Sequence, residues 1–111
     1  MKNSDIKTIA KEVIKIEADA VSLIADRIDK NFESAVNTIL QCKGRLIVSG
    51  MGKSGFISQK IASTMASTGT PSHFVHPGEA IHGDLGMITE EDVLIKVDFC
   101  YFTLQTIDKY F

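Results

Sequence analysis

The sequence predicts an α/β fold built on a parallel sheet. Two observations favour this fold class. Segments with helical spacing of apolar residues alternate along the chain with three short apolar runs of strand length. Loops separate these segments, as expected where crossover helices connect parallel strands.

Size and composition indicate one small folded domain. The chain has 111 residues, of which 44% are hydrophobic and 23% charged, and its net charge is −2. These values are typical of a globular domain and do not favour nucleic acid as a partner. We expect no membrane segment, because no apolar stretch approaches the roughly 20 residues that span a bilayer. The N-terminus also lacks the apolar run of a signal peptide.

The two cysteines carry little functional signal. Cys42 and Cys100 are far apart in the sequence and match no metal or redox spacing. We therefore expect two ordinary thiols in a reducing cytoplasm.

The first predicted element is a long amphipathic helix over Asp5–Ile28, with Ser4 or Asp5 as its cap. Its apolar seam comprises Ile6, Ile9, Val13, Ile16, Ala20 and Leu23. Such a helix would be on the order of 36 Å long, and one small domain can cover only part of it. The seam therefore favours packing against a second copy of the chain. The alternative is that the seam packs entirely on the chain's own sheet.

Two further helices flank the first strand. The stripe of the second helix comprises Phe32, Val36, Ile39 and Leu40, and Gly44 stands where a residue after the helix C-terminus is expected. The run Leu46–Val48 predicts a buried strand. A third helix is expected from Phe56 and should end before Gly69, with Ala62 and Ala66 allowing close packing on the sheet.

Two more strands follow the third helix. We expect one over His73–His76, ended by Pro77–Gly78, and another beginning with Asp92–Ile95. Between them, residues 79–86 form a polar turn with room for one short helix. This order of elements completes the prediction of a parallel sheet.

The loop after the first strand has the strongest functional signal. Gly50, Gly52 and Gly55 fit the dinucleotide pattern Gly-x-Gly-x-x-Gly, but no acidic residue ends the second strand as a nicotinamide site requires. A nucleotide P-loop needs glycine where this chain has Ile47. What remains is a glycine loop with Lys53 at a helix N-terminus, which suits a phosphate monoester. The alternative is a tight turn whose glycines serve packing and whose lysine is solvated.

A second group of titratable residues follows the second strand and comprises His76, Glu79, His82 and Asp84. Sites of α/β proteins lie after strands, and a histidine there could move a proton between two atoms of a sugar. The alternative is a solvated turn with His76 bonded to the backbone. A zinc site formed by His76, His82 and Asp84 matches no recognised ligand spacing. His73, on the strand itself, is interpreted as structural.

Three stretches together carry a family resemblance: Val48–Gly55, Ala66–Pro71 and Phe74–Ile88. They resemble the sugar isomerase (SIS) domain of bacterial arabinose 5-phosphate isomerases. The resemblance covers residues 1–95, which we assign to the N-terminal part of one SIS domain together with its leading helices. It implies a three-layer, flavodoxin-like parallel sheet of the SIS type.

The resemblance implies an aldose–ketose isomerase that interconverts D-arabinose 5-phosphate and D-ribulose 5-phosphate, the entry step to Kdo for lipopolysaccharide. The proton moves between C1 and C2 through an enediol, and no organic cofactor is needed. Implied catalytic residues are Lys53 and His82, and implied substrate-binding residues are Gly52, Lys53, Ser54, Gly69, Thr70, His76 and His82. The resemblance also implies a zinc ion on His76 and a homo-oligomer, which agrees with the seam on the first helix.

The chain departs from this family after the third strand. SIS domains have a serine-rich loop there that ends in Ser-Gly and holds the sugar phosphate, whereas this chain has residues 96–102 without that pair. Lys96 and Asp98 also interrupt a strand that should be apolar. We assign residues 96–111 to no domain and interpret them as the out-of-frame tail of a truncated, inactive product. The alternatives to an isomerase are a non-catalytic sugar-phosphate-binding module and a nicotinamide-binding fragment.

Overall fold

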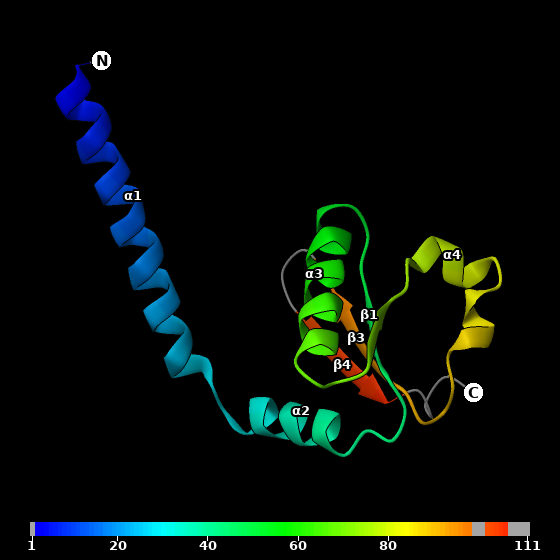
Figure 1. Cartoon of the computed structure of the whole chain (residues 1–111). Coiled ribbons are helices and arrows are strands. Elements are labelled where there is room, and N and C mark those ends of the chain that lie inside the picture. The colour runs from blue at the N-terminus through cyan, green and yellow to red at the C-terminus, as the bar shows by residue number, and fades with distance from the viewer. Residues whose placement is uncertain (1, 99–101, 107–111) are drawn as a thin grey trace. The chain divides into compact units, whose positions relative to one another are not determined.

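The computed structural model describes residues 2–98 and 102–106, and Figure 1 gives the ribbon. The chain divides into two compact units, one up to Ser34 and the other from Ala35 onward. In the part of the chain that the structure describes, no helix is long and apolar enough to cross a membrane.

The first unit contains α1 (Asn3–Ile24), which continues into a 3-10 turn over Ala25–Arg27. Lys2 is the N-cap, and its backbone N–H donates to the Asp5 carboxylate at 3.2 Å. The predicted helix is therefore confirmed, but neither Ser4 nor Asp5 is its N-cap. Large apolar side chains of the predicted seam are exposed, namely Ile6, Ile9, Val13, Ile16 and Leu23.

The short helix α2 (Lys30–Leu40) begins where the sequence pattern of the first helix breaks. Asp29 is the cause, because its Oδ1 accepts the backbone N–H groups of Asn31 at 2.9 Å and Phe32 at 3.2 Å. A side-chain carboxylate that accepts the first helical N–H groups is the usual way to start a helix. The second predicted helix is thus confirmed.

The second unit contains a four-stranded sheet in the order β2-β1-β3-β4. Its strands are β1 (Leu46–Ser49), β2 (Ser72–Phe74), β3 (Val93–Val97) and β4 (Phe102–Thr106). β1 pairs in parallel with both β2 and β3, as predicted. β4 was not predicted and runs antiparallel to β3. An antiparallel neighbour needs only a short connection, whereas another parallel strand would need a crossover.

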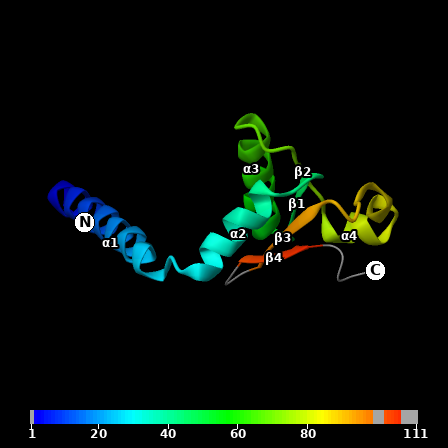
Figure 2. The ribbon, with the colours of Figure 1, turned by 90° about the horizontal axis from the view of Figure 1, so that it is seen from below.

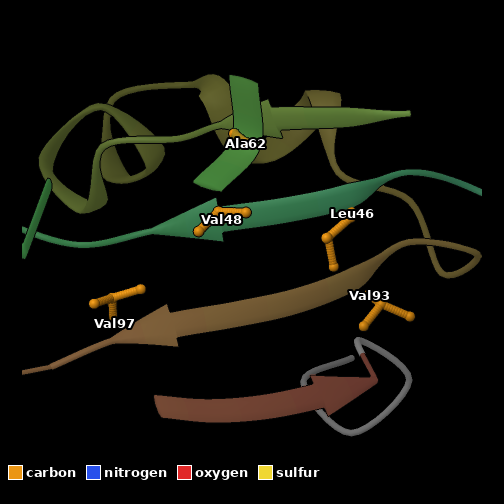
Figure 3. Close-up of a cluster of buried hydrophobic side chains, with 5 residues drawn as sticks. All are labelled: Leu46, Val48, Ala62, Val93 and Val97. Carbon is orange, nitrogen blue, oxygen red and sulfur yellow. The ribbon is translucent and has the colours of Figure 1, made fainter. Parts of the chain in front are cut away.

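The helix α3 (Lys53–Ser67) packs on one face of this sheet, against β1, β2 and β3 (Figure 2). The core beneath it comprises Leu46, Val48, Ala62, Val93 and Val97 (Figure 3). All three residues of the run Leu46–Val48 are buried, as expected for a central parallel strand. Ala62 is buried in agreement with the predicted close packing, but Ala66 is exposed, so that part of the prediction is wrong.

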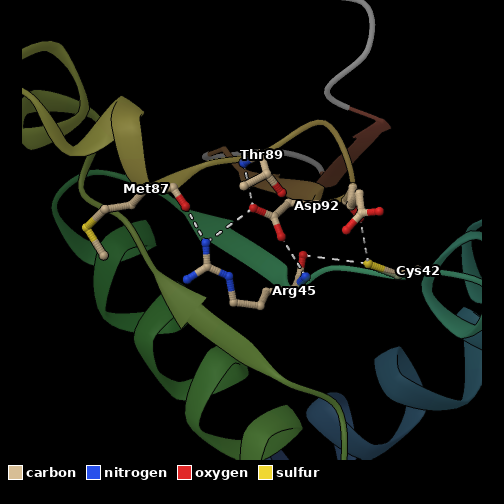
Figure 4. Close-up of polar contacts among 6 residues, drawn as sticks. Cys42, Arg45, Met87, Thr89 and Asp92 are labelled. Carbon is tan, nitrogen blue, oxygen red and sulfur yellow. Dashed lines mark hydrogen bonds and ion pairs between the residues drawn. The ribbon is translucent and has the colours of Figure 1, made fainter.

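A buried carboxylate joins the amino ends of β1 and β3 (Figure 4). Asp92 accepts the backbone N–H of Arg45 at 2.6 Å, that of Thr89 at 2.8 Å and the Arg45 guanidinium at 3.4 Å. The same guanidinium donates to the carbonyl of Met87. Burial by itself raises the pKa of Asp92, but these hydrogen bonds and the guanidinium charge outweigh burial, so the pKa is lowered overall.

Gly44 and Cys42 also belong to this end of the sheet. The N–H of Gly44 donates to the Glu91 carbonyl at 3.0 Å, and a Cβ at Gly44 would clash with the Asp92 carboxylate. α2 already ends at Leu40, so the predicted role of Gly44 in ending the second helix is wrong, and the close approach of two segments explains this glycine instead. The half-buried Cys42 thiol faces the carbonyl oxygens of Arg45 and Glu91, while Cys100 lies outside the described residues.

Candidate functional site

The carboxyl ends of three strands meet at one edge of the second unit. β1 leads through residues 50–52 into α3, and β2 leads through Val75 and His76 into the short helix α4 (Pro77–Ile81). β3 ends at Val97. Because these strands are parallel, all three connections leave from the same edge. Open α/β sheets bind their ligands at this edge.

The loop after β1 is held tightly against α3. Gly52 is the N-cap of α3 and has a φ of 59°, a conformation that favours glycine. A Cβ at Gly50 would lie 2.6 Å from Oγ of Ser58 and 2.8 Å from the carbonyl oxygen of Ser54. The buried Ser58 hydroxyl donates to the same carbonyl at 2.7 Å. Glycines therefore do serve packing here, and that packing fixes the loop in front of α3.

Lys53 and Ser54 are the first two residues of α3. The sequence predicts this helix from Phe56 onward, and the structure corrects its start to Lys53. Backbone N–H groups at the start of a helix have no partner within it and carry partial positive charge. The ammonium group of Lys53 adds a full charge at the same point. The first turn of α3 thus has the chemistry of an anion-binding element.

An open pocket of about 560 Å³ lies at this edge of the sheet. Its volume falls within the roughly 300–1,000 Å³ of small-molecule sites. The lining residues are Ser49, Gly50, Met51, Lys53, Ser54, Pro77, Lys96, Val97 and Asp98. Lys53 and Ser54, both predicted binding residues, therefore share one pocket. Gly52 lies within the loop that forms its wall but is not itself a lining residue.

Lys96 and Asp98 are pocket residues that the sequence interpretation missed. Lys96 pairs in register with Ser49, the last residue of β1. This pairing places the end of β3 beside the loop that carries Lys53. Their position in the sequence could have identified them, because polar residues at the carboxyl end of a parallel strand lie at the ligand-binding edge of the sheet. By sequence pattern alone, both residues are instead interpreted as interruptions of the strand.

The histidines after β2 lie at the same edge but do not line the pocket. His76 is the N-cap of α4, where its Nδ1 accepts the Gly78 N–H at 3.0 Å. The backbone hydrogen bond that the alternative interpretation gives to His76 is therefore present at Nδ1, and the neutral ring carries its proton on Nε2. The neighbouring Pro77 lines the pocket. His82 is the exposed C-cap of α4 and is not a lining residue.

A zinc ion does not fit His76 in this arrangement. A neutral histidine binds metal through a nitrogen that carries no proton, and its other N–H usually donates to a neighbour. In His76 the unprotonated Nδ1 is occupied by the Gly78 N–H. Among the described side chains, which do not include that of Asp84, no three His, Cys, Asp or Glu groups could hold a metal together.

Gly69 and Thr70 lie at the other end of α3. Thr70 donates its N–H to the Met65 carbonyl at 2.9 Å, and the Leu46 N–H donates to the Pro71 carbonyl at 2.8 Å. These bonds place the segment beside the amino end of β1, a full helix length from Lys53. Within one chain, Gly69 and Thr70 therefore do not share the pocket with Lys53, and their predicted contact with substrate would need a second chain.

Comparison with protein families gives a match to the SIS domain over residues 39–108. This span includes all four strands of the sheet. It also includes most of the tail after Lys96 that the sequence analysis assigns to no domain.

Two relatives from Escherichia coli K12 are arabinose 5-phosphate isomerases. The chain is 52% identical to KdsD over 93 residues and 48% identical to GutQ over 89 residues. These matches cover 84% and 80% of this chain but only 28% of each relative. The chain therefore spans little more than a quarter of the length of the curated relatives it matches.

A solved structure from E. coli CFT073, in complex with arabinose 5-phosphate, is similar in fold to this chain. It superposes with a TM-score of 0.78 at 43% sequence identity. The matched part covers 86% of this chain and 51% of that chain. The predicted α/β class is thereby confirmed as part of the fold that this structure has.

Proposed function

The chain belongs to the SIS domain family, and from this premise we propose that its pocket binds the phosphate group of D-arabinose 5-phosphate. One observation carries the proposal: Lys53 and Ser54, at the N-terminus of α3, line a pocket at the carboxyl edge of three parallel strands. A phosphate there meets helical N–H groups, a hydroxyl group and an ammonium group together. The KdsD and GutQ isomerases and the solved complex with arabinose 5-phosphate support the choice of sugar.

The reaction that this site would serve is the interconversion of D-arabinose 5-phosphate and D-ribulose 5-phosphate. A proton leaves C2 of the aldose and is delivered to C1 through an enediol, while O1 gains a proton and O2 loses one, so no redox or organic cofactor takes part. In this proposal the Lys53 ammonium holds the phosphate on C5 and so positions C1 and C2 for the reaction, and His82 moves the proton. His76 donates a hydrogen bond to the sugar through Nε2–H.

Binding without turnover is the second candidate function. His82, to which the proposal gives the proton transfer, is exposed and does not line the pocket that holds Lys53. A general base must lie within hydrogen-bond reach of the proton it removes, although catalytic contacts often tighten only in the complex. A single chain that binds sugar phosphate but places His82 too far away would act as a sensing module.

We also propose that the protein is a cytoplasmic homo-oligomer in which α1 forms the contact between copies. The apolar side chains of its seam are exposed, and Val13 near the middle of the helix is 47% exposed. A second copy that covers this seam would remove apolar area from water.

Two measurements on the purified chain test these functions. Isothermal titration with D-arabinose 5-phosphate, D-arabinose and NADH should give binding for the phosphorylated sugar alone. Binding of NADH without binding of the sugar phosphate would overturn the proposal. Formation of D-ribulose 5-phosphate then separates the two candidates, since an isomerase turns over substrate and a sensing module only binds it.

A further inference from the structure

Two lysines reach the same pocket from elements that are far apart in the sequence. Lys53 comes from the first turn of α3 and Lys96 from the carboxyl end of β3. The parallel pairing of Lys96 with Ser49 holds β3 beside the strand from which the glycine loop departs. The pairing of the strands, and not a flexible loop, therefore places both residues in the wall of one pocket.

Lys96 has no evident structural task in the described residues. Val97 and Ile95, its neighbours along β3, pack in or against the core under α3. Side chains alternate along a strand, so Lys96 points to the other face, where it is exposed. Among the side chains that the structure describes, neither Lys96 nor Lys53 forms an ion pair. Both ammonium groups are thus available to a ligand.

We propose that Lys96 is a second cationic ligand for the phosphate group, acting together with Lys53 and the Ser54 hydroxyl. This inference rests on the proposed function and adds to it a binding residue that neither the glycine loop nor the histidines supply. A phosphate monoester carries a charge of about −1.5 to −2 at pH 7, which one lysine only partly balances. Charge-assisted hydrogen bonds from two directions fix its orientation as well as its charge.

Asp98 allows a second test of this proposal, because its charge is opposite to that of Lys96 and should have the opposite effect on phosphate binding. Its carboxylate lines the same pocket and carries the charge that a phosphate group repels. The charge of Asp98 therefore lowers the affinity for a phosphate group near Lys96, and removing that charge should raise the affinity. The sugar hydroxyls, in contrast, can donate hydrogen bonds to a carboxylate.

The experiment titrates the full chain with inorganic phosphate and with D-arabinose 5-phosphate at low ionic strength, where charge interactions are least screened. Lys96→Met keeps most of the aliphatic stem, Lys96→Arg keeps the charge, and Lys60→Met is the matched control on an exposed lysine of α3 outside the pocket. Circular dichroism of each variant checks that the fold is retained. Since Lys96→Arg and Asp98→Asn leave a polar side chain in place, they answer the question even if Lys96→Met fails to fold.

We expect Lys96→Met to weaken binding of both ligands about tenfold, or about 1.4 kcal/mol. Lys96→Arg should retain most of the affinity, Lys60→Met all of it, and Asp98→Asn should bind inorganic phosphate more tightly than the wild type. Unchanged binding in Lys96→Met, together with a loss in Lys53→Met, would overturn this inference and leave the proposed function intact.

The two proposals can also fail separately in the other direction. If inorganic phosphate binds through both lysines but the sugar phosphate does not, the cationic site stands and the proposed function falls. If the wild-type chain binds neither ligand, both are overturned.

Discussion

Lys96 of β3 lies directly across from Ser49 of β1 in the parallel register of the sheet. Together with the parallel pairing of β1 and β2, this register explains why one pocket contains residues from three connections that are separated in the sequence. The glycine loop follows Ser49 immediately, so the end of β3 is fixed next to Lys53. The pocket is therefore formed by strand pairing. Substitutions in the glycine loop or at the strand ends should change its ligand affinity.

Lys53→Met should weaken binding of D-arabinose 5-phosphate by roughly 10- to 100-fold. The reason is the loss of one charge-assisted hydrogen bond, worth about 1.5–3 kcal/mol, while the helical N–H groups remain. Isothermal titration measures the effect, and Lys60→Met, on the same helix but outside the pocket, is the control. Equal losses in both variants would mean that net charge alone is being measured.

Gly50→Ala should destabilise the second unit by about 1–3 kcal/mol and weaken sugar-phosphate binding at the same time, because overpacking shifts the backbone. The new Cβ would lie 2.6 Å from Oγ of Ser58 and 2.8 Å from the carbonyl oxygen of Ser54. Urea unfolding and titration report the two effects. Gly86→Ala is the control, since no atom lies within 4 Å of the position of its Cβ.

The double variant Gly50→Ala/Ser58→Ala separates the two contacts. Removing the Ser58 hydroxyl relieves one of them but leaves the Ser54 carbonyl in place and deletes a buried hydrogen bond. We therefore expect at most partial recovery of stability. Full recovery would show that the backbone at Ser54 yields easily and that the loop is less constrained than we infer.

The sequence was sufficient to predict those elements for which local residue patterns agree with the fold. An apolar run, a glycine loop and a helical pattern in direct succession predict β1, the loop and α3, and with them the placing of Lys53 and Ser54 in a ligand site. The boundaries were less certain because the last glycine of the loop, Gly55, is already helical. A residue that ends one pattern can belong to the next element.

Long-range features were not predictable in the same way. Parallel strands are nearly continuous apolar runs, so Lys96 was interpreted as a break, and its place in a pocket depends on register with β1. β4 has no glycine or proline before it to announce a turn. The distance between Gly69 and Lys53 follows from the length of α3, which separates residues that the family resemblance groups together.

His76→Asn should preserve α4 and weaken sugar-phosphate binding. His76→Ala should both destabilise α4 and weaken sugar-phosphate binding. An asparagine side chain is a good N-cap and can accept the Gly78 N–H in place of Nδ1. It lacks the Nε2–H donor that we assign to the sugar. Chemical shifts of residues 77–81 monitor the helix, and titration monitors binding. Wild-type affinity in His76→Asn would remove His76 from the site and leave only its capping role.

Val13→Glu should shift the protein from oligomer to monomer. Val13 belongs to the apolar seam of α1 and is exposed, and burying a new charge in a contact between copies would be costly. Light scattering coupled to size exclusion gives the mass in solution. Ile14→Glu is the matched control, because Ile14 is also exposed on α1 but lies off the predicted seam. A wild-type monomer, or equal dissociation by both variants, would count against the seam as the interface.

Asp92→Asn should lower the free energy of unfolding by about 1–3 kcal/mol at pH 7. The carboxylate accepts N–H groups from Thr89 and Arg45 on its two oxygens, and an amide would turn an NH₂ group toward one of these donors. Urea unfolding at pH 7 measures the loss. Glu90→Gln, an exposed neighbour, is the control and should change the free energy of unfolding little.

The difference between the wild type and Asp92→Asn should also depend on pH in one direction. The pKa of Asp92 is lowered in the folded state relative to the unfolded value of about 3.9. Its contribution to stability is therefore present above about pH 4 and is lost as the pH falls through the folded-state pKa. Unfolding curves at pH 7, 4 and 3 should show the two proteins converging at acid pH. A difference that stays constant or grows over this range would mean that packing of the side chain, and not its charge, joins β1 to β3.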